Sequence, residues 1–222
     1  MDCSTSRSRW ILSAALLAIV TIASQGGCTS MLATVAWVIQ GGEVPAEYTG
    51  MKNKSIAVVC RPLVELEYTN SRSAEEIAKQ VGGLLEAKIR KTRVIDPRQV
   101  AQWTDEHDWN DFAEVGKALK ADLVLGIDLS EFNLYQGQTL YQGKARVVLK
   151  VYDVAQNGKV VYEKKLPPTV YPPNVAIPTS DQPEDQFRQQ FIRVLSDEIG
   201  RHFYGHDTRA DFARDSKTLS EG

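Results

Sequence analysis

Three short, β-branched runs in the middle of the chain predict strands of a sheet. They are SIAVVC at residues 55–60, TRVID at 92–96 and ADLVLGIDL at 121–129. The residues between them carry apolar side chains at helical spacing, which predicts a helix over about 74–91, a weaker one near 97–103, and a third that begins at Asp108 or Asn110. Because strand-helix-strand passes favour right-handed crossovers, these three strands are expected to lie parallel.

The first of these helices has a recognisable start and a clear apolar face. Ser73 and Glu76 have the spacing of a capping box, which places the start at about residue 74. The apolar face then comprises Ile77, Val81, Leu84, Leu85 and Ile89. In the third helix, Phe112, Val115 and Leu119 form the equivalent stripe. Both helices are therefore expected to pack on the sheet.

The second half of the pattern changes from crossovers to a hairpin. In KARVVLKVYDV every second residue is apolar, which favours a strand with one buried face made of Ala145, Val147, Leu149 and Val151. Asn157 and Gly158 tolerate the positive φ of a tight turn, so KVVYEKKL at 159–166 is expected to return antiparallel. A proline-rich loop follows.

A last helix is expected to open at Pro183 and to end near Gly205. Its buried positions are Phe187, Phe191, Leu195, Ile199 and Phe203. The pattern as a whole predicts an α/β fold with a three-layer-like mixed sheet and the element order β-α-β-α-β-β-β-α. The first part is parallel and the second part is an antiparallel hairpin.

The amino-terminal pattern is different, because residues 10–23 carry no charge and follow Arg7 and Arg9. A charged start before a short apolar run is typical of an export signal. Fourteen residues are too few for a membrane-spanning helix, which needs about 20. A second apolar run at residues 31–39 leaves an uncleaved anchor open as an alternative.

The end of the apolar run, SQGGC, resembles the lipobox of bacterial lipoproteins at Gly26, Gly27 and Cys28. It departs from that pattern at Gln25, where the family has an aliphatic residue. The resemblance implies cleavage before Cys28 and acylation of that cysteine, with palmitate among the acyl groups. An ordinary cleaved signal remains the other reading. Thr29 and Ser30 lack the aspartate that retains many lipoproteins at the inner membrane, so the resemblance favours the periplasmic face of the outer membrane.

These observations divide the chain into four parts. Residues 1–27 are the expected signal peptide, 28–52 a lipidated membrane-proximal segment and linker, 53–207 a single α/β domain, and 208–222 a disordered polar tail. Cys3 lies in the signal and Cys28 is the expected lipid site, which leaves Cys60 without a partner for an intramolecular disulfide.

Charge and motifs exclude several functions. The 222 residues carry a formal net charge of −2, so no basic excess favours nucleic acid as a partner. Phosphate-binding loops, zinc-ligand spacings and nucleophile elbows are absent from the sequence. His202 and His206 stand four apart but fit a helix end better than a metal site. We therefore expect a non-enzymatic protein with no cofactor and no metal.

The order of motifs resembles CsgG-like envelope lipoproteins and the amino-terminal domain of TolB. The segments are VGKALKADLVLGIDLSEF and VYDVAQNGKVVYEKKL, and the matching residues are Ala121, Asp122, Gly126, Asp153, Gly158 and Val160. The resemblance spans about residues 53–206, and the chain is also similar to lipoproteins of planctomycete-type bacteria. Pore-forming CsgG relatives carry long alternating hairpins, whereas residues 133–144 here repeat LYQG and are mostly polar. The adaptor members are therefore the closer analogy.

Two surfaces are candidates for binding partners. The loop after the first strand lies where open α/β sheets bind ligands, and it offers Arg61, Glu65, Glu67, Tyr68 and Asn70. The LYQG repeat offers Tyr135 and Tyr141. We predict an adaptor or an assembly or transport accessory factor, held to the membrane by lipid on Cys28, that binds other envelope proteins. The alternative is a small-ligand or cell-wall-fragment binding module using residues 61–72. Self-association is left open.

Overall fold

The computed structural model describes residues 43–62 and 67–207. Of the two units into which the chain divides, the second comprises the described residues from 44 to 206. The features below belong to the second unit. β1 (Glu43–Val44) and β9 (His206–Asp207) are two-residue strands where the chain passes from one unit to the other.

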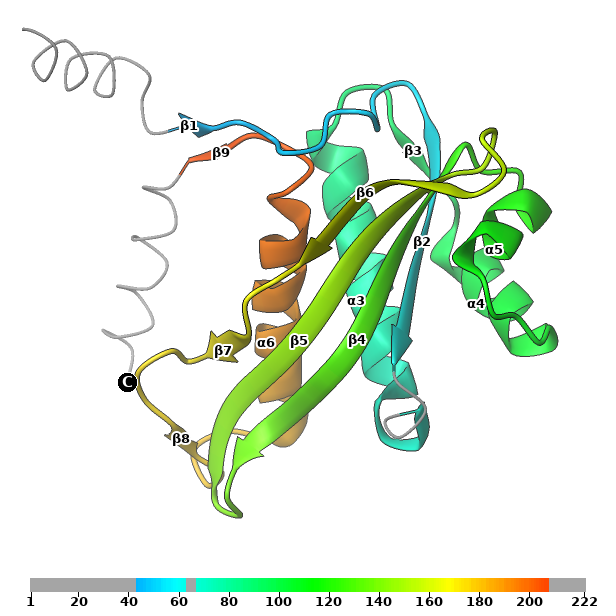
Figure 1. The fold of residues 1–222 in the computed structure, drawn as a ribbon. Helices are drawn as coiled ribbons and strands as arrows, with labels where there is room; N and C mark the ends of the chain where they lie inside the picture. Colours follow the sequence, from blue (N-terminus) through cyan, green and yellow to red (C-terminus); the bar gives the residue numbers. More distant parts are fainter. Residues whose placement is uncertain (1–42, 63–66, 208–222) are drawn as a thin grey trace, which may run out of the picture. The chain divides into compact units, whose positions relative to one another are not determined.

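A mixed sheet with the strand order β3-β2-β4-β5-β6 forms the centre of the second unit. β2 (Ser55–Pro62) lies parallel to β3 (Arg93–Val94) and to β4 (Leu123–Gln136). β5 (Leu140–Asp153) is antiparallel to β4 and to β6 (Lys159–Lys165). Two short strands, β7 (Thr169–Tyr171) and β8 (Ile177–Pro178), pair with the first part of β5. The predicted α/β fold with a parallel and an antiparallel part is confirmed (Figure 1).

Helices pack on both faces of β2, and the alternation of its side chains shows which helices cover each face. Ile56 and Val58 belong to a core shared with α3 (Glu67–Lys88) and α6 (Glu184–Gly200). Ala57 and Val59 belong to a second core shared with α4 (Pro97–Glu106) and α5 (Phe112–Ala118). Since successive residues of a strand point to opposite faces, the two cores lie on opposite sides of β2.

Two predicted boundaries near β2 are wrong. α3 begins at Glu67 rather than near residue 74, and Ser73 of the predicted capping box is buried inside it. Ser73 is 4% exposed, so the same spacing is compatible with a helix interior. β3 has two residues rather than five. The chain leaves the sheet early because Asp96 caps α4, accepting a hydrogen bond from the backbone N–H of Arg98 at 2.9 Å.

Two helix ends also differ from the prediction. Asp111, not Asp108 or Asn110, caps α5, and its side chain accepts from the N–H of Ala113 at 3.0 Å. α6 opens after Pro183 as predicted but ends at Gly200 rather than near Gly205. The apolar pattern extended the predicted helix too far, because Phe203 is buried although it follows the helix.

The long hairpin of β4 and β5 confirms the alternating pattern. Ala145, Val147, Leu149 and Val151 are all at most 1% exposed. The LYQG repeat lies within this hairpin, which extends β4 past the predicted end at residue 129. Asn157 and Gly158 have φ of 57° and 77°, as expected for the turn into β6. Within the described residues, no helix has both the length and the apolar character needed to cross a bilayer.

Candidate functional site

The edge of β2 that faces β3 is paired over only part of its length. β3 pairs with β2 at Ser55 and Ile56, and the N–H of Ile95 continues the lane by donating to the Ile56 carbonyl at 2.9 Å. Backbone groups of a strand point alternately to its two neighbours, so those of Val58 and Cys60 point to the same side as those of Ile56. In the described part of the chain no strand lies beside them there.

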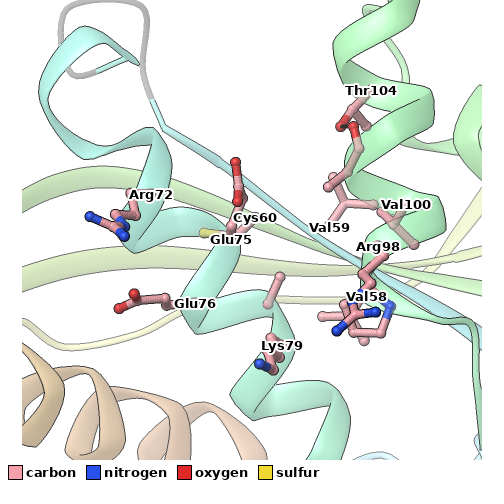
Figure 2. Close-up of a pocket in the computed structure, with 13 residues that line it drawn as sticks. Val58, Val59, Cys60, Arg72, Glu75, Glu76, Lys79, Arg98, Val100 and Thr104 are labelled. Atoms are coloured by element: carbon pink, nitrogen blue, oxygen red, sulfur yellow. Dashed lines mark hydrogen bonds between the residues drawn. The ribbon is translucent and has the colours of Figure 1, made fainter.

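A groove lies along this edge, with α3 as one wall and α4 as the other (Figure 2). Its volume is about 270 Å³. The floor consists of Val58, Val59 and Cys60. Ala78 from α3 and Val100 and Ala101 from α4 supply apolar parts of the walls. The site therefore combines an apolar cleft with backbone groups free to pair, which is the arrangement of an exposed sheet edge.

Charged side chains surround the groove. α3 contributes Arg72, Glu75, Glu76 and Lys79, and α4 contributes Arg98. Figure 2 shows Lys79 and Arg98 at the Val58 end of the groove, on different helices, and Arg72 near the other end. Among the described residues, none of the five charged groups has an ion-pair partner within the protein. These charges are available to a bound molecule.

Cys60 lies on the groove floor, and its surroundings keep the thiol neutral. Burial raises the pKa of Cys60 far above its ordinary value, and the nearby Asp128 carboxylate raises it further. Because the thiolate is the reactive form of cysteine, a thiol that stays protonated is a poor nucleophile. Cys60 is a packing residue of the groove floor.

Arg61, a predicted partner-binding residue, makes its contacts inside the protein. Its Nη2 donates to Asp128 Oδ1 at 2.9 Å, and its Nη1 donates to the Asn110 carbonyl at 3.1 Å. The guanidinium carbon also lies 4.5 Å from the centre of the Phe112 ring. These contacts fix the end of β2 to α5 and β4. Arg61 points to the opposite face of β2 from Cys60, because the two are consecutive in the strand.

The other predicted site residues are spread over separate places. Glu65 lies outside the described residues, and Glu67, Tyr68 and Asn70 lie in the first turn of α3. Tyr135 and Tyr141 face each other across the β4–β5 hairpin with ring centres 5.3 Å apart. The structure brings the two tyrosines together but does not place them beside the groove, whose lining includes neither of them. Binding by these residues stays a prediction.

His202 is also held within the protein. Its Nδ1 lies 3.2 Å from Glu47 Oε1, and Glu47 in addition accepts a hydrogen bond from the Tyr162 hydroxyl at 3.1 Å. Burial lowers the pKa of His202, which favours the neutral ring. The contacts tie the segment before β2 to β6 and to the residues that follow α6.

Sequence reasoning missed most of the residues that line the groove; the exceptions are Cys60 and Arg72, the last residue of the segment 61–72. Lys79 and Arg98 lie on the exposed sides of their helices, where a charged residue is ordinary. They line a groove only because β3 ends after two residues and leaves the edge of β2 open. The strand pattern of five residues at 92–96 predicted a longer β3. The closest signal in the sequence was Pro97, which marks the start of a helix immediately after TRVID.

Comparison with known proteins gives the fold neighbourhood only. No protein-family model matches the chain, and no curated protein matches it. One similar solved structure is the PelC dodecamer from Paraburkholderia phytofirmans, with 15% identity, a TM-score of 0.40, and coverage of 69% of this chain and 92% of that one. A second is lipoprotein GNA1162 from Neisseria meningitidis, with 12% identity, a TM-score of 0.38, and coverage of 66% and 98%.

A third is the LpoB carboxy-terminal domain from Salmonella enterica, with 15% identity, a TM-score of 0.35, and coverage of 61% and 91%. The similar structures thus include bacterial lipoproteins. None of these three is a CsgG-like protein or TolB by name, so that finer resemblance stays a prediction. Identities and TM-scores this low carry no argument about function.

Proposed function

We propose that this protein is a lipid-anchored adaptor of a bacterial envelope that binds a partner protein in the groove beside β2. The observation that carries the proposal is the unpaired edge of β2 between α3 and α4. A sheet edge with free N–H and C=O groups is a template for another extended chain. The proposed partner is therefore a polypeptide, and the proposed action is binding rather than chemistry.

The shape of the groove supports a polypeptide over a small molecule. The groove runs along the unpaired edge of β2, where the backbone groups of Val58 and Cys60 face it. An extended chain gains backbone hydrogen bonds along the edge whatever its side chains, and it does not need a deep cavity. The unpaired rim charges then supply selectivity among partners.

The amino-terminal sequence supports the location. Residues 7–28 have the basic start, at Arg7 and Arg9, the short apolar run and the cysteine of a lipoprotein signal. We propose that lipid on Cys28 holds the domain at the periplasmic face of a membrane, with the outer membrane favoured. Labelling with an alkyne fatty acid tests this anchor: the wild-type chain should take up the label, and Cys28→Ala should not. Equal labelling of both would remove the anchor from the proposal.

Crosslinking in cells tests the groove as the binding surface. A photo-crosslinking amino acid is placed at Thr104, which lines the groove, and in a matched control at Gln189, which is exposed on α6. We expect a discrete protein adduct from position 104 and none of the same mass from 189. Mass spectrometry identifies the adduct. If both positions give the same adducts, or neither gives any, the groove is not the binding surface.

A further inference from the structure

The unpaired lane beside β2 is closed at one end. β3 and Ile95 occupy the lane as far as Ile56, and the chain then turns away into α4. Beyond that point, residues 58–62 offer a length of about 16 Å at ~3.3 Å per residue. A strand that enters from the Pro62 end meets β3 after four or five residues. A lane closed in this way favours the terminus of a chain over an internal segment.

The charges at the closed end indicate which terminus fits. Lys79 and Arg98 approach the Val58 end from the two walls, and both are exposed (Figure 2). The acidic side chains that line the groove, Glu75 and Glu76, lie on α3. Two cations on facing walls favour an anionic group between them, and a free carboxylate is the one anion that every polypeptide carries at its end.

We infer that the groove takes the free carboxyl terminus of a partner polypeptide, added antiparallel to β2 with its terminal carboxylate between Lys79 and Arg98. This inference rests on the proposed function, because it presumes a polypeptide partner. The carboxyl terminus lies at the Val58 end, and the rest of the partner leaves the groove past Pro62. The N–H and C=O groups of Val58 and Cys60 pair with the added strand.

The walls set the side-chain pattern of the added strand. Alternate side chains of an edge strand face the two sides of the sheet. One set therefore faces Ala78 on α3, and the other faces Val100 and Ala101 on α4. The apolar parts of both walls are small, so short apolar side chains are expected where the added strand faces them, and the terminal carboxylate faces Lys79 and Arg98.

The first test uses a library of random octapeptides attached through their amino ends, so that each carboxyl terminus is free. The purified full chain in detergent selects binders from it, and an otherwise equal library attached through its carboxyl ends is the control. Binders should come from the first library alone. Amidation of the terminal carboxylate of a selected peptide should weaken binding about tenfold or more. The inference would be overturned if no peptide bound, or if amidation left the affinity of the selected peptides unchanged.

Variants of the rim locate the carboxylate. Lys79→Gln and Arg98→Gln should each weaken binding of the selected peptide about tenfold. In each variant, most of the difference in affinity between the free-carboxylate peptide and the amidated peptide should disappear. Arg72→Gln removes a cation from the other end of the groove and should change binding less than threefold. All three side chains are exposed, so unchanged thermal unfolding is the check on folding. An equal loss in all three variants would refute the proposed position.

Amide exchange tests the strand geometry. The N–H groups of Val58 and Cys60 should become protected when the selected peptide binds. Those of Ala57 and Val59 should change little, because they already face β4. A peptide that binds without protecting Val58 and Cys60 would overturn strand addition. The two proposals can fail separately. If position 104 crosslinks to a partner that binds without its carboxyl terminus, the adaptor function stands and this inference fails. If a peptide binds tightly but position 104 gives no adduct in cells, the adaptor function fails.

Discussion

Two residues of the resemblance to CsgG-like and TolB proteins have a direct structural explanation at the scale of single side chains. Asp122 joins β2 to the start of β4: its Oδ2 accepts hydrogen bonds from the Ser55 N–H at 2.7 Å and from the Ser55 hydroxyl at 2.8 Å. Gly126 lies under the Phe112 ring, where an added Cβ would be 2.9 Å from a ring carbon. Both positions therefore serve packing and strand pairing.

Asp122 should contribute stability that depends on pH. The Ser55 backbone and side-chain hydrogen bonds hold the pKa of Asp122 below its ordinary value of 3.8. A lowered folded-state pKa gives stability that is present above the unfolded value and is lost as pH falls through the folded one. Asp122→Asn should cost about 1 kcal/mol at pH 7, because the carboxylate is partly exposed. Urea unfolding at pH 7 and pH 3 measures both effects.

The acid dependence distinguishes this role from simple packing. As pH falls from about 4 through the folded-state pKa of Asp122, the wild-type protein should lose stability in part because this carboxylate becomes protonated. The Asn variant should lose less stability over the same interval. Asp96→Asn is the control, because it changes a carboxylate that caps α4 without joining β2 to β4. If the Asp122 variant is as acid-sensitive as wild type, the hydrogen bonds from Ser55 do not stabilise the charged form.

Two glycines should respond to alanine in opposite directions. A Cβ at Gly143 would lie 2.5 Å from a carbon of the Phe191 ring, inside the main core. Gly143→Ala should therefore cost about 1–3 kcal/mol through overpacking. Gly83 lies on the exposed side of α3 with nothing within 4 Å, so Gly83→Ala should stabilise by about 0.5–1 kcal/mol. Chemical unfolding gives both values, and equal effects would contradict the packing shown here.

At the scale of elements, the LYQG repeat places equivalent tyrosines opposite each other with different surroundings. Tyr141 is 4% exposed and stacks on Phe187 with ring centres 4.8 Å apart. Tyr135 is 36% exposed, and its hydroxyl donates to Glu184 at the start of α6. These two contacts fix the hairpin to α6, together with the buried Phe132 ring, whose centre lies 5.3 Å from that of Phe191. This contrast gives the repeat a structural role.

The two tyrosines should differ in both stability and titration. Tyr141→Ala should cost about 3 kcal/mol, as usual for a buried ring, while Tyr135→Phe should cost about 1 kcal/mol or less. The hydrogen bond to Glu184 raises the pKa of Tyr135 to about 12. In Glu184→Gln this pKa should fall toward 10, measured by NMR of ring-labelled tyrosine with Tyr135→Phe to assign the signal. An unchanged pKa would exclude the carboxylate as its cause.

The elements themselves were largely predictable, but the groove was not. The β-branched runs, the alternation around Val147 and the Asn157–Gly158 turn each depend on local pattern, and each was confirmed. The free edge of β2 depends on where β3 stops, and that follows from Asp96 capping α4 rather than continuing a strand. The groove also needs α3 and α4 on opposite faces of the sheet, which no local pattern specifies. The sequence therefore predicted Arg61 as a binding residue instead of the groove residues; in the structure Arg61 contacts Asp128 and the Phe112 ring, and binding by it stays a prediction.

At the scale of the whole molecule, the proposals assign two separate tasks to two parts of the chain. The amino-terminal segment carries the expected anchor at Cys28, and the α/β domain carries the groove. Anchoring depends on a covalent bond to lipid, whereas partner binding depends on backbone pairing and the rim charges. Since the two rest on different chemistry and different residues, changes to one should leave the other intact.

This independence predicts the behaviour of two variants measured side by side. Cys28→Ala should lose fatty-acid labelling, while the purified variant binds a selected peptide within twofold of wild type. The Lys79→Gln, Arg98→Gln double variant should keep full labelling and start at Cys28 by mass spectrometry, while its peptide affinity falls at least tenfold. A loss of peptide affinity in Cys28→Ala would show that the anchor segment takes part in binding. Retained labelling would place the lipid on another residue, because an amide-linked or thioester-linked chain elsewhere survives the loss of this sulfur.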